Sequence, residues 1–267
     1  MHRTRTIPTA LAFVLALLVA AAPALAVEVQ ERLEKTYDLG AGGEVSVGNV
    51  NGAVVVEGWD RDEVRVVAVK KAKASTRARA EEVLDKIEVR ITRSGSRLEI
   101  DTRRPESSNS VFSWLFGNGV SGDVSYTVSV PRRTDLEVDT VNGHVEVRGV
   151  EGHVEADTTN GGIEMADIRG SVDAGTTNGA IRVRLAEVAA GRSMSFSTTN
   201  GGIHVTVPRA ARVTLDASTT NGGIDLDDLP AADVRTHGRR HLKAEINGGG
   251  PTIELSTTNG GITISGG

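Results

Sequence analysis

The sequence predicts an all-β fold of the β-solenoid type, in which the chain coils and equivalent strands of successive coils stack in parallel. Three observations lead to this prediction: a recurring Asn-Gly pair, apolar residues with a period of two on both sides of that pair, and an unusual composition. The chain has 267 residues, of which 31 are Gly and only 3% are aromatic. An ordinary protein contains about 7% Gly. The composition therefore suits a molecule with many tight corners and a core of small aliphatic side chains.

Residues 1–26 predict a secretory signal peptide. Arg3 and Arg5 give a positive start, residues 10–22 form an unbroken apolar run, and Ala24 and Ala26 fit the small-residue cleavage pattern. The apolar run is too short to span a bilayer comfortably. We expect a mature chain that begins at Val27, has no transmembrane segment, and is exported to the periplasm, the cell surface or the extracellular medium.

Charge and cysteine content narrow the possible partners. The formal net charge is −5, which argues against nucleic acid as a partner. The chain has no Cys, so disulfides and thiolate metal sites are excluded. We expect no cofactor.

Residues 27–130 predict the first coils together with a cap over the end of the stack, because the end coils of a solenoid need to be covered. An amphipathic helix is expected at about 75–86, with Ala80, Val83 and Leu84 on one face and Ser75 or Thr76 as N-cap. Two alternating stretches, 87–91 and 98–100, flank Ser94-Gly95-Ser96 and predict a β-hairpin.

Residues 131–267 predict the repeat solenoid. From Asn142 the Asn-Gly pairs recur at nearly even intervals as far as Asn221, and five copies read Thr-Thr-Asn-Gly. The interval from Asn221 to Asn259 is nearly twice as long, which we interpret as two periods with one degenerate copy. The predicted corner residues, including an early copy, are Asn51, Gly52, Asn142, Gly143, Asn160, Gly161, Asn178, Gly179, Asn200, Gly201, Asn221, Gly222, Asn259 and Gly260.

Four positions around each Asn are apolar in all seven aligned copies: six and four residues before it, and three and five residues after it. Each copy is thus a strand, a corner and a second strand. A chain of β-hairpins would also use Asn-Gly turns. We favour the solenoid, because stacked coils let identical Asn and Thr side chains hydrogen-bond along the stack. A Gly is expected after Asn because the corner needs a positive φ or leaves no room for Cβ.

The predicted coil has about 18–22 residues, and a right-handed sense is expected from the general preference for right-handed crossovers. The last copy ends at Gly267 without an evident cap. An uncovered end exposes unpaired backbone groups, so we expect end-to-end self-association or partner docking at that copy.

Several segments together resemble a known family. They are Gly43-Glu-Val-Ser-Val-Gly-Asn-Val-Asn-Gly52, the following Val-Val-Val-Glu-Gly-Trp59-Asp60, Val128-Ser-Val-Pro131 and the Thr-Thr-Asn-Gly-Gly-Ile copies. They are similar to the exported, adhesin-like β-strand-repeat proteins of the family DUF4097. The resemblance implies a single-stranded, right-handed β-helix-like domain associated with bacterial envelopes. It implies no catalytic residues.

Acidic residues recur at the outward positions five and three before Asn. Stacked coils would align them in a stripe, and dense carboxylates can bind Ca²⁺ weakly. A solvated face is the simpler interpretation. The residues of this acidic stripe are Glu137, Asp139, Glu155, Asp157 and Asp173.

The stretch 103–122 predicts an aromatic loop. Phe112, Trp114, Leu115 and Phe116 lie in a segment otherwise rich in Gly, Ser and Asn. Aromatic side chains on loops of a rigid scaffold often bind partners. The alternative is a lid that folds back over the first coils.

These observations predict a non-enzymatic, envelope-associated binding or structural module of the adhesin type, whose partner is an envelope protein or a glycan. A ligand-sensing or adaptor module in envelope-stress signalling is the alternative. A carbohydrate-active β-helix enzyme is a third candidate, but the acidic stripe lacks the interleaved Arg or Lys that polysaccharide cleavage would need.

Overall fold

The computed structural model describes residues 26–103, 120–236 and 239–267. Twenty strands and one helix form in these residues, which confirms the predicted all-β class. In chain order they are β1 (Val27–Asp38), β2 (Gly43–Gly48), β3 (Val54–Trp59), β4 (Glu63–Ala74), α1 (Arg77–Asp85), β5 (Glu88–Ser94), β6 (Arg97–Arg103), β7 (Ser121–Pro131), β8 (Thr134–Asn142), β9 (Val145–Arg148), β10 (Glu151–Asn160), β11 (Ile163–Asn178), β12 (Ile181–Val188), β13 (Met194–Asn200), β14 (Ile203–Val207), β15 (Val213–Asn221), β16 (Ile224–Asp227), β17 (Ala231–Thr236), β18 (His241–Ile246), β19 (Thr252–Asn259) and β20 (Ile262–Gly266).

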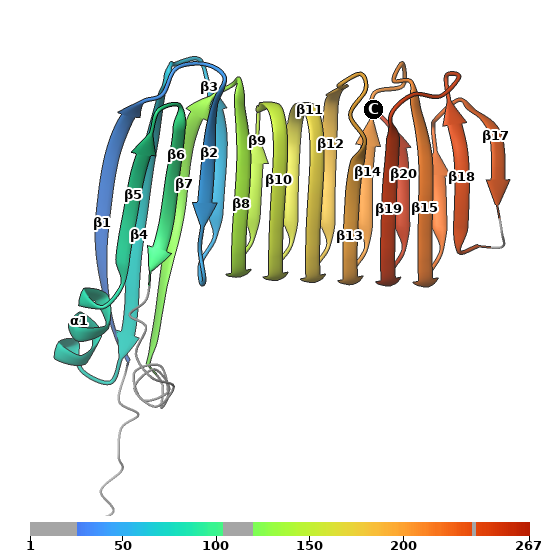
Figure 1. Cartoon of the computed structure of the whole chain (residues 1–267). Helices are drawn as coiled ribbons and strands as arrows, with labels where there is room; N and C mark the ends of the chain where they lie inside the picture. Colours follow the sequence, from blue (N-terminus) through green and yellow to red (C-terminus); the bar gives the residue numbers. More distant parts are fainter. Residues whose placement is uncertain (1–25, 104–119, 237–238) are drawn as a thin grey trace, which may run out of the picture.

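The strands form two ladders that run along the molecule (Figure 1). Ladder A contains the strands that lead into the Asn-Gly corners, with the hairpin β5–β6 at one end and the hairpin β17–β18 at the other. Its spatial order is β5-β6-β2-β8-β10-β11-β13-β19-β15-β18-β17. Ladder B contains the strands that leave the corners, and β1, β4 and β7 extend it at one end. Its order is β1-β4-β7-β3-β9-β11-β12-β14-β20-β16. The long strand β11 takes part in both. The repeat copies pair in parallel, as a stack of coils requires and a chain of hairpins does not.

The core lies between the two ladders and consists of the four predicted apolar columns. Every residue of these columns is buried except Ile224 and Leu226, which are partly buried in β16 at the end of ladder B. Fully burying such an aliphatic side chain contributes about 1.5–3 kcal/mol. The period-two alternation is therefore the main source of stability, and it dictates which face of each strand turns inward.

The corner asparagines form one continuous hydrogen-bond chain. From Asn142 onward, each Nδ2 donates to the Oδ1 of the asparagine on the preceding coil of the stack over 2.8–2.9 Å. The Nδ2 of Asn51, at the end of this series, donates to the carbonyl of Gly122 over 3.4 Å. The order along the stack is Asn51, Asn142, Asn160, Asn178, Asn200, Asn259 and Asn221. This series of hydrogen bonds explains why Asn recurs at the same position of every corner.

The corner threonines bond to the backbone of the neighbouring coil instead of to each other. In each Thr-Thr-Asn-Gly copy, the hydroxyl of the first Thr donates to the carbonyl of a corner Gly over 2.9–3.2 Å. The simple Thr ladder expected from the sequence is therefore wrong in detail, because a glycine carbonyl lies within reach of each hydroxyl.

The Gly after each Asn is required by close packing of the coils. A Cβ at any of these seven positions would lie 1.8–2.2 Å from a backbone oxygen of the adjacent coil. Only Gly52 among them has a positive φ, of 114°. Of the two reasons expected from the sequence, lack of space is therefore the general one.

The N-terminal elements agree closely with expectation. Helix α1 begins after Thr76, whose side chain accepts a hydrogen bond from the backbone N–H of Arg79, and it buries Ala80, Val83 and Leu84. It packs against β1 and β4. Strands β5 and β6 pair antiparallel around Gly95, which has a φ of 61°.

The end of the stack differs from expectation. The last copy, β19–β20, is not terminal: it lies between β13–β14 and β15–β16 (Figure 1). End-to-end association at that copy is therefore wrong, because neighbours occupy both of its edges. The long interval between Asn221 and Asn259 holds no degenerate coil either. It holds the antiparallel hairpin β17–β18, which extends ladder A beyond β15.

Candidate functional site

The acidic stripe predicted from the sequence exists on the outer face of ladder A. Glu137 lies beside Glu155, which lies beside Asp173 on the next strand. Asp139 lies beside Asp157 in the second column. Neighbouring strands are about 4.8 Å apart, so the carboxylates of each column are close together.

Some carboxylates of the stripe have partners within the fold. Arg97 bonds to Glu44 and, over 3.2 Å, to Glu137. Asp173 Oδ1 accepts a hydrogen bond of 2.8 Å from the backbone N–H of Ser195. These contacts tie neighbouring coils together and give this part of the stripe a structural role.

Two aspartates of the stripe are held in an unfavourable environment for charge. Partial burial, together with the charges of Asp139, Glu155 and Asp173, raises the pKa of Asp157. Partial burial and the nearby Glu137 raise the pKa of Asp139. In the described part of the chain, no three His, Asp or Glu side chains converge as a metal site. Calcium binding by the stripe therefore stays a prediction.

The other predicted binding residues, Phe112, Trp114, Leu115 and Phe116, lie outside the described residues. Their role also stays a prediction.

A polar hollow of about 390 Å³ lies on the outer face of ladder B. Arg148, Arg182, Arg184 and His204 contribute to its wall, together with Glu164. Arg148 is paired with the carboxylate of Glu146 at 2.6 Å, whereas Arg182 and Arg184 form no ion pair among the described residues. The hollow mixes charges of both signs, so it does not define one class of ligand.

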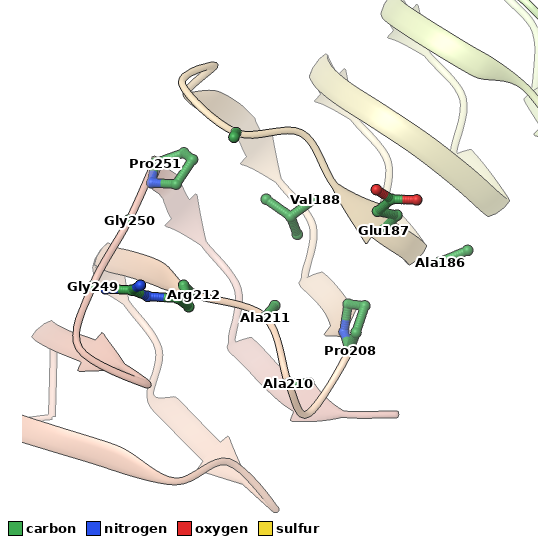
Figure 2. Close-up of a pocket in the computed structure, with 11 residues that line it drawn as sticks. Ala186, Glu187, Val188, Pro208, Ala210, Ala211, Arg212, Gly249, Gly250 and Pro251 are labelled. Carbon is green, nitrogen blue, oxygen red and sulfur yellow. The ribbon is translucent and has the colours of Figure 1, made fainter.

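An apolar pocket of about 560 Å³ opens at the edge of the stack opposite the Asn-Gly corners (Figure 2). Three segments form it: residues 186–190 at and just after the end of β12, residues 208–212 after β14, and residues 249–251 before β19. Its wall consists mainly of small apolar residues and two prolines, Pro208 and Pro251. It is concave and apolar with a few polar groups, which are the usual properties of a small-molecule site.

Two charged side chains lie at this pocket, and they differ in their partners. Glu187 pairs with Arg169 at 3.6 Å. Arg212 is exposed and has no ion pair in the described residues. Its guanidinium is therefore available to a negatively charged group of a ligand whose apolar part fills the pocket.

Two features of the sequence point to this pocket, although neither belongs to the Asn-Gly repeat pattern. The interval from Asn178 to Asn200 is longer than the two intervals before it. The longer interval contains the end of β12 and the stretch that follows it, and Ala186, Glu187, Val188 and Ala190 of this region form one wall. The second feature is a proline in each of the other two loops, Pro208 and Pro251. Neither feature shows that the loops of three coils surround one space.

Comparison with known proteins identifies the class of the molecule. The family model described as Toastrack DUF4097 matches residues 121–265. This chain belongs to that family, as the resemblance of its repeat segments implied. No curated protein matches the chain significantly.

Three solved structures align with most of this chain at low sequence identity. One from Clostridium sporogenes, titled a "putative cell adhesion protein", shares 14% identity over 90% of this chain and 100% of its own, with a TM-score of 0.37. A "putative adhesin" from Bacteroides fragilis shares 10% over 88% and 97%, with a TM-score of 0.30. A "putative lipid binding protein" from Parabacteroides distasonis shares 8% over 87% and 96%, with a TM-score of 0.25.

The helical content adds one further finding. The single helix in the described ranges has nine residues, and no helix there is long and apolar enough to cross a bilayer.

Proposed function

We propose that this protein is a non-enzymatic, exported module of the bacterial envelope that binds a partner in the manner of an adhesin. Membership of the Toastrack family supports a module of this kind. The observation that carries the proposal is the apolar pocket, because it offers a concave binding surface on a rigid two-ladder scaffold. The signal peptide, the right-handed sense and the predicted coil length stay predictions that belong to this proposal.

The chemistry of the pocket defines the ligand. Val188, Ala211 and the two prolines present an apolar surface, and Arg212 adds an exposed positive charge. The pocket therefore suits an amphipathic group with an apolar body and an anionic end. Such groups occur on envelope lipids and on modified glycans, so the partner can be an envelope molecule.

Anilinonaphthalene sulfonate tests the pocket, because it joins an apolar ring system to one sulfonate. We expect its fluorescence to rise on binding to the folded chain. Val188→Glu should abolish the rise, because it places a charge in the apolar wall. Arg212→Ala should weaken dye binding about tenfold, since it removes one charge-assisted contact.

Val141→Glu is the matched control, because Val141 is 41% exposed at the opposite edge of the stack. It should leave dye binding unchanged. If Val188→Glu and Val141→Glu bind the dye equally well, the pocket is not the site and the proposal loses its main support.

Protease treatment of intact cells tests the adhesin role separately. An adhesin must be cleaved from outside. If the chain is cleaved only after the outer layer is permeabilised, it is a periplasmic module, and the sensing or adaptor role becomes the better interpretation.

A further inference from the structure

The last repeat copy is inserted between two copies that follow each other directly in the chain. Asn259 pairs with Asn200 on one side and with Asn221 on the other. Strand β20 likewise lies between β14 and β16. The slot between the copies at Asn200 and Asn221 is therefore filled by a segment from much further along the chain.

The two walls of this slot are chemically equivalent to the segment that fills it. Asn259 donates to Asn200 and accepts from Asn221, both over 2.8–2.9 Å. The hydroxyl of Thr257 donates to Gly201, and that of Thr219 donates to Gly260. Any second Thr-Thr-Asn-Gly coil could make the same bonds, because the bonds involve only groups that all five Thr-Thr-Asn-Gly copies share.

The chain between the two walls of the slot is long enough for the walls to stack directly on each other. Asn178 and Asn200 lie on directly stacked coils. The interval from Asn200 to Asn221 is only slightly shorter than the interval between those two residues, so it can also connect stacked coils. Strand β15 is held independently by the antiparallel strand β18. If the inserted coil left, the stack would be one layer shorter and the rest of the chain would stay connected. Every other repeat coil is joined to the chain at both ends, so it cannot leave in this way.

The inserted coil is attached through a turn that suits a hinge. Residues 247–250 are Asn-Gly-Gly-Gly, and the first three have positive φ values of 52°, 83° and 75°. The Asn247 side chain fixes the turn through bonds of 2.9 and 2.8 Å to the carbonyls of Arg209 and Ala211. Glycine tolerates many backbone conformations, so this turn can open without steric penalty.

We propose that the coil β19–β20 is exchangeable: it leaves its slot and enters the same slot of a second copy of this chain, which gives a reciprocally swapped dimer. Every strand pairing of the monomer is kept in the dimer, and only the turn at 247–250 changes. Exchange of an identical element is a low-cost route to a dimer. The partner is a second copy because the slot is complementary to this chain's own repeat.

The absence of Cys makes a direct test possible. Ser197 and Ser256 are in register on β13 and β19, and both are exposed. In-register residues on neighbouring strands are about 4.8 Å apart, which lies within the Cα spacing that a disulfide accepts. Full-length Ser197→Cys and full-length Ser256→Cys are mixed, held in mild denaturant, returned to buffer and oxidised. We expect a disulfide-linked heterodimer on a non-reducing gel.

Two controls make the outcome decisive. Ser197 lies on β13 and Ser218 lies on β15, the two opposite walls of the slot, so they do not meet between chains in a swapped dimer. A mixture of Ser197→Cys and Ser218→Cys therefore measures random collision. The double variant Ser197→Cys/Ser256→Cys should form an internal disulfide in the monomer, which verifies the geometry and locks the coil.

If the coil exchanges, the mixture of Ser197→Cys and Ser256→Cys should give several times more disulfide-linked dimer than the mixture of Ser197→Cys and Ser218→Cys. The double variant, once its internal disulfide has formed, should give no linked dimer. Equal amounts in the two mixtures, with the internal disulfide formed as expected, would overturn the proposal.

Discussion

Thr140 shows how sharply one residue position is constrained by its neighbours. Its hydroxyl is buried and is the only buried side-chain polar atom without a hydrogen-bond partner in the described residues. The equivalent threonines donate to the Gly carbonyl of the neighbouring coil. The neighbour of Thr140 is Gly52, whose carbonyl instead accepts from Asn49 Nδ2 over 3.0 Å. The departure of the first copy from Thr-Thr-Asn-Gly thus leaves one hydroxyl unpaired.

We expect Thr140→Val to be neutral or to stabilise the fold by up to about 1 kcal/mol, because it removes a buried, unpaired hydroxyl. Thr176→Val should destabilise the fold by about 1 kcal/mol, because it breaks the 3.0 Å bond to Gly161. Equilibrium unfolding in urea measures both. Equal destabilisation by the two variants would contradict this account.

Asp157 gives a prediction about pH. Its pKa is raised mainly by partial burial and then by neighbouring carboxylates, so the folded state holds this proton more tightly than the unfolded state does. Stability is therefore lost as pH rises through the pKa of the folded protein, and the full cost applies at neutral pH. The effect is small because Asp157 is only partly buried, and water still screens its charge.

Asp157→Asn should raise the melting temperature by about 1–2 °C at pH 7 and leave it unchanged near pH 3, where the wild-type carboxyl is already protonated. Calorimetry at the two pH values measures this. Asp173→Asn is the contrasting variant, because it weakens a carboxylate acceptor for Ser195 N–H. It should lower the melting temperature at pH 7. A gain of equal size at both pH values for Asp157→Asn would exclude the charge explanation.

At the scale of the element, the Asn-Gly corner sets how closely coils stack. At Gly179 a Cβ would lie 1.9 Å from the backbone oxygen of Gly161, and neither backbone can move without separating two coils. The following position of the corner is different: at Gly223 a Cβ would meet nothing within 4 Å. The first Gly of the corner is thus a packing requirement, and the second is not one at this copy.

We expect Gly179→Ala to cost about 3 kcal/mol or more, at the upper end of the range for overpacking. Gly223→Ala is the matched control and should change stability by less than about 0.5 kcal/mol. Thermal unfolding followed by circular dichroism separates the two. Tolerance of both substitutions would show that the coils can separate locally.

At the scale of the whole molecule, the two ladders end differently. Ladder A is extended beyond β15 by the hairpin β17–β18, whereas ladder B ends at β16, which pairs only with β20 among the described strands. Strand β16 has four residues, and its Asp225 and Asp227 point outward. Short length and charge are common means by which edge strands avoid pairing with other molecules.

The double variant Asp225→Thr/Asp227→Thr should therefore self-associate at high concentration, because it leaves an uncharged edge beside the half-buried Ile224 and Leu226. Sedimentation velocity measures the association. The control Glu155→Thr/Asp157→Thr removes the same charge from β10, which lies inside ladder A, and should associate no more than the wild-type chain does. Association of the control to the same extent would assign the effect to net charge.

The sequence by itself determined the class of the fold, the inward face of nearly every strand, the positions of the corners and the stacking of their asparagines. This was possible because the apolar columns repeat with a period of two and each copy reports the same local structure. It also indicated the helix near 75–86, the first hairpin and the acidic columns, all of which depend on local pattern or on parallel register between adjacent copies.

The tertiary structure decided the order of the coils and the location of the pocket. The copies at Asn200, Asn221 and Asn259 all present the same Thr-Thr-Asn-Gly edge, so local chemistry does not distinguish Asn221 from Asn259 as the neighbour of Asn200. Only the whole chain decides between them, because the hairpin β17–β18 occupies β15 and directs β19 into the slot. The pocket has the same origin: it exists only where that insertion brings residues 249–251 beside the loops after β12 and β14.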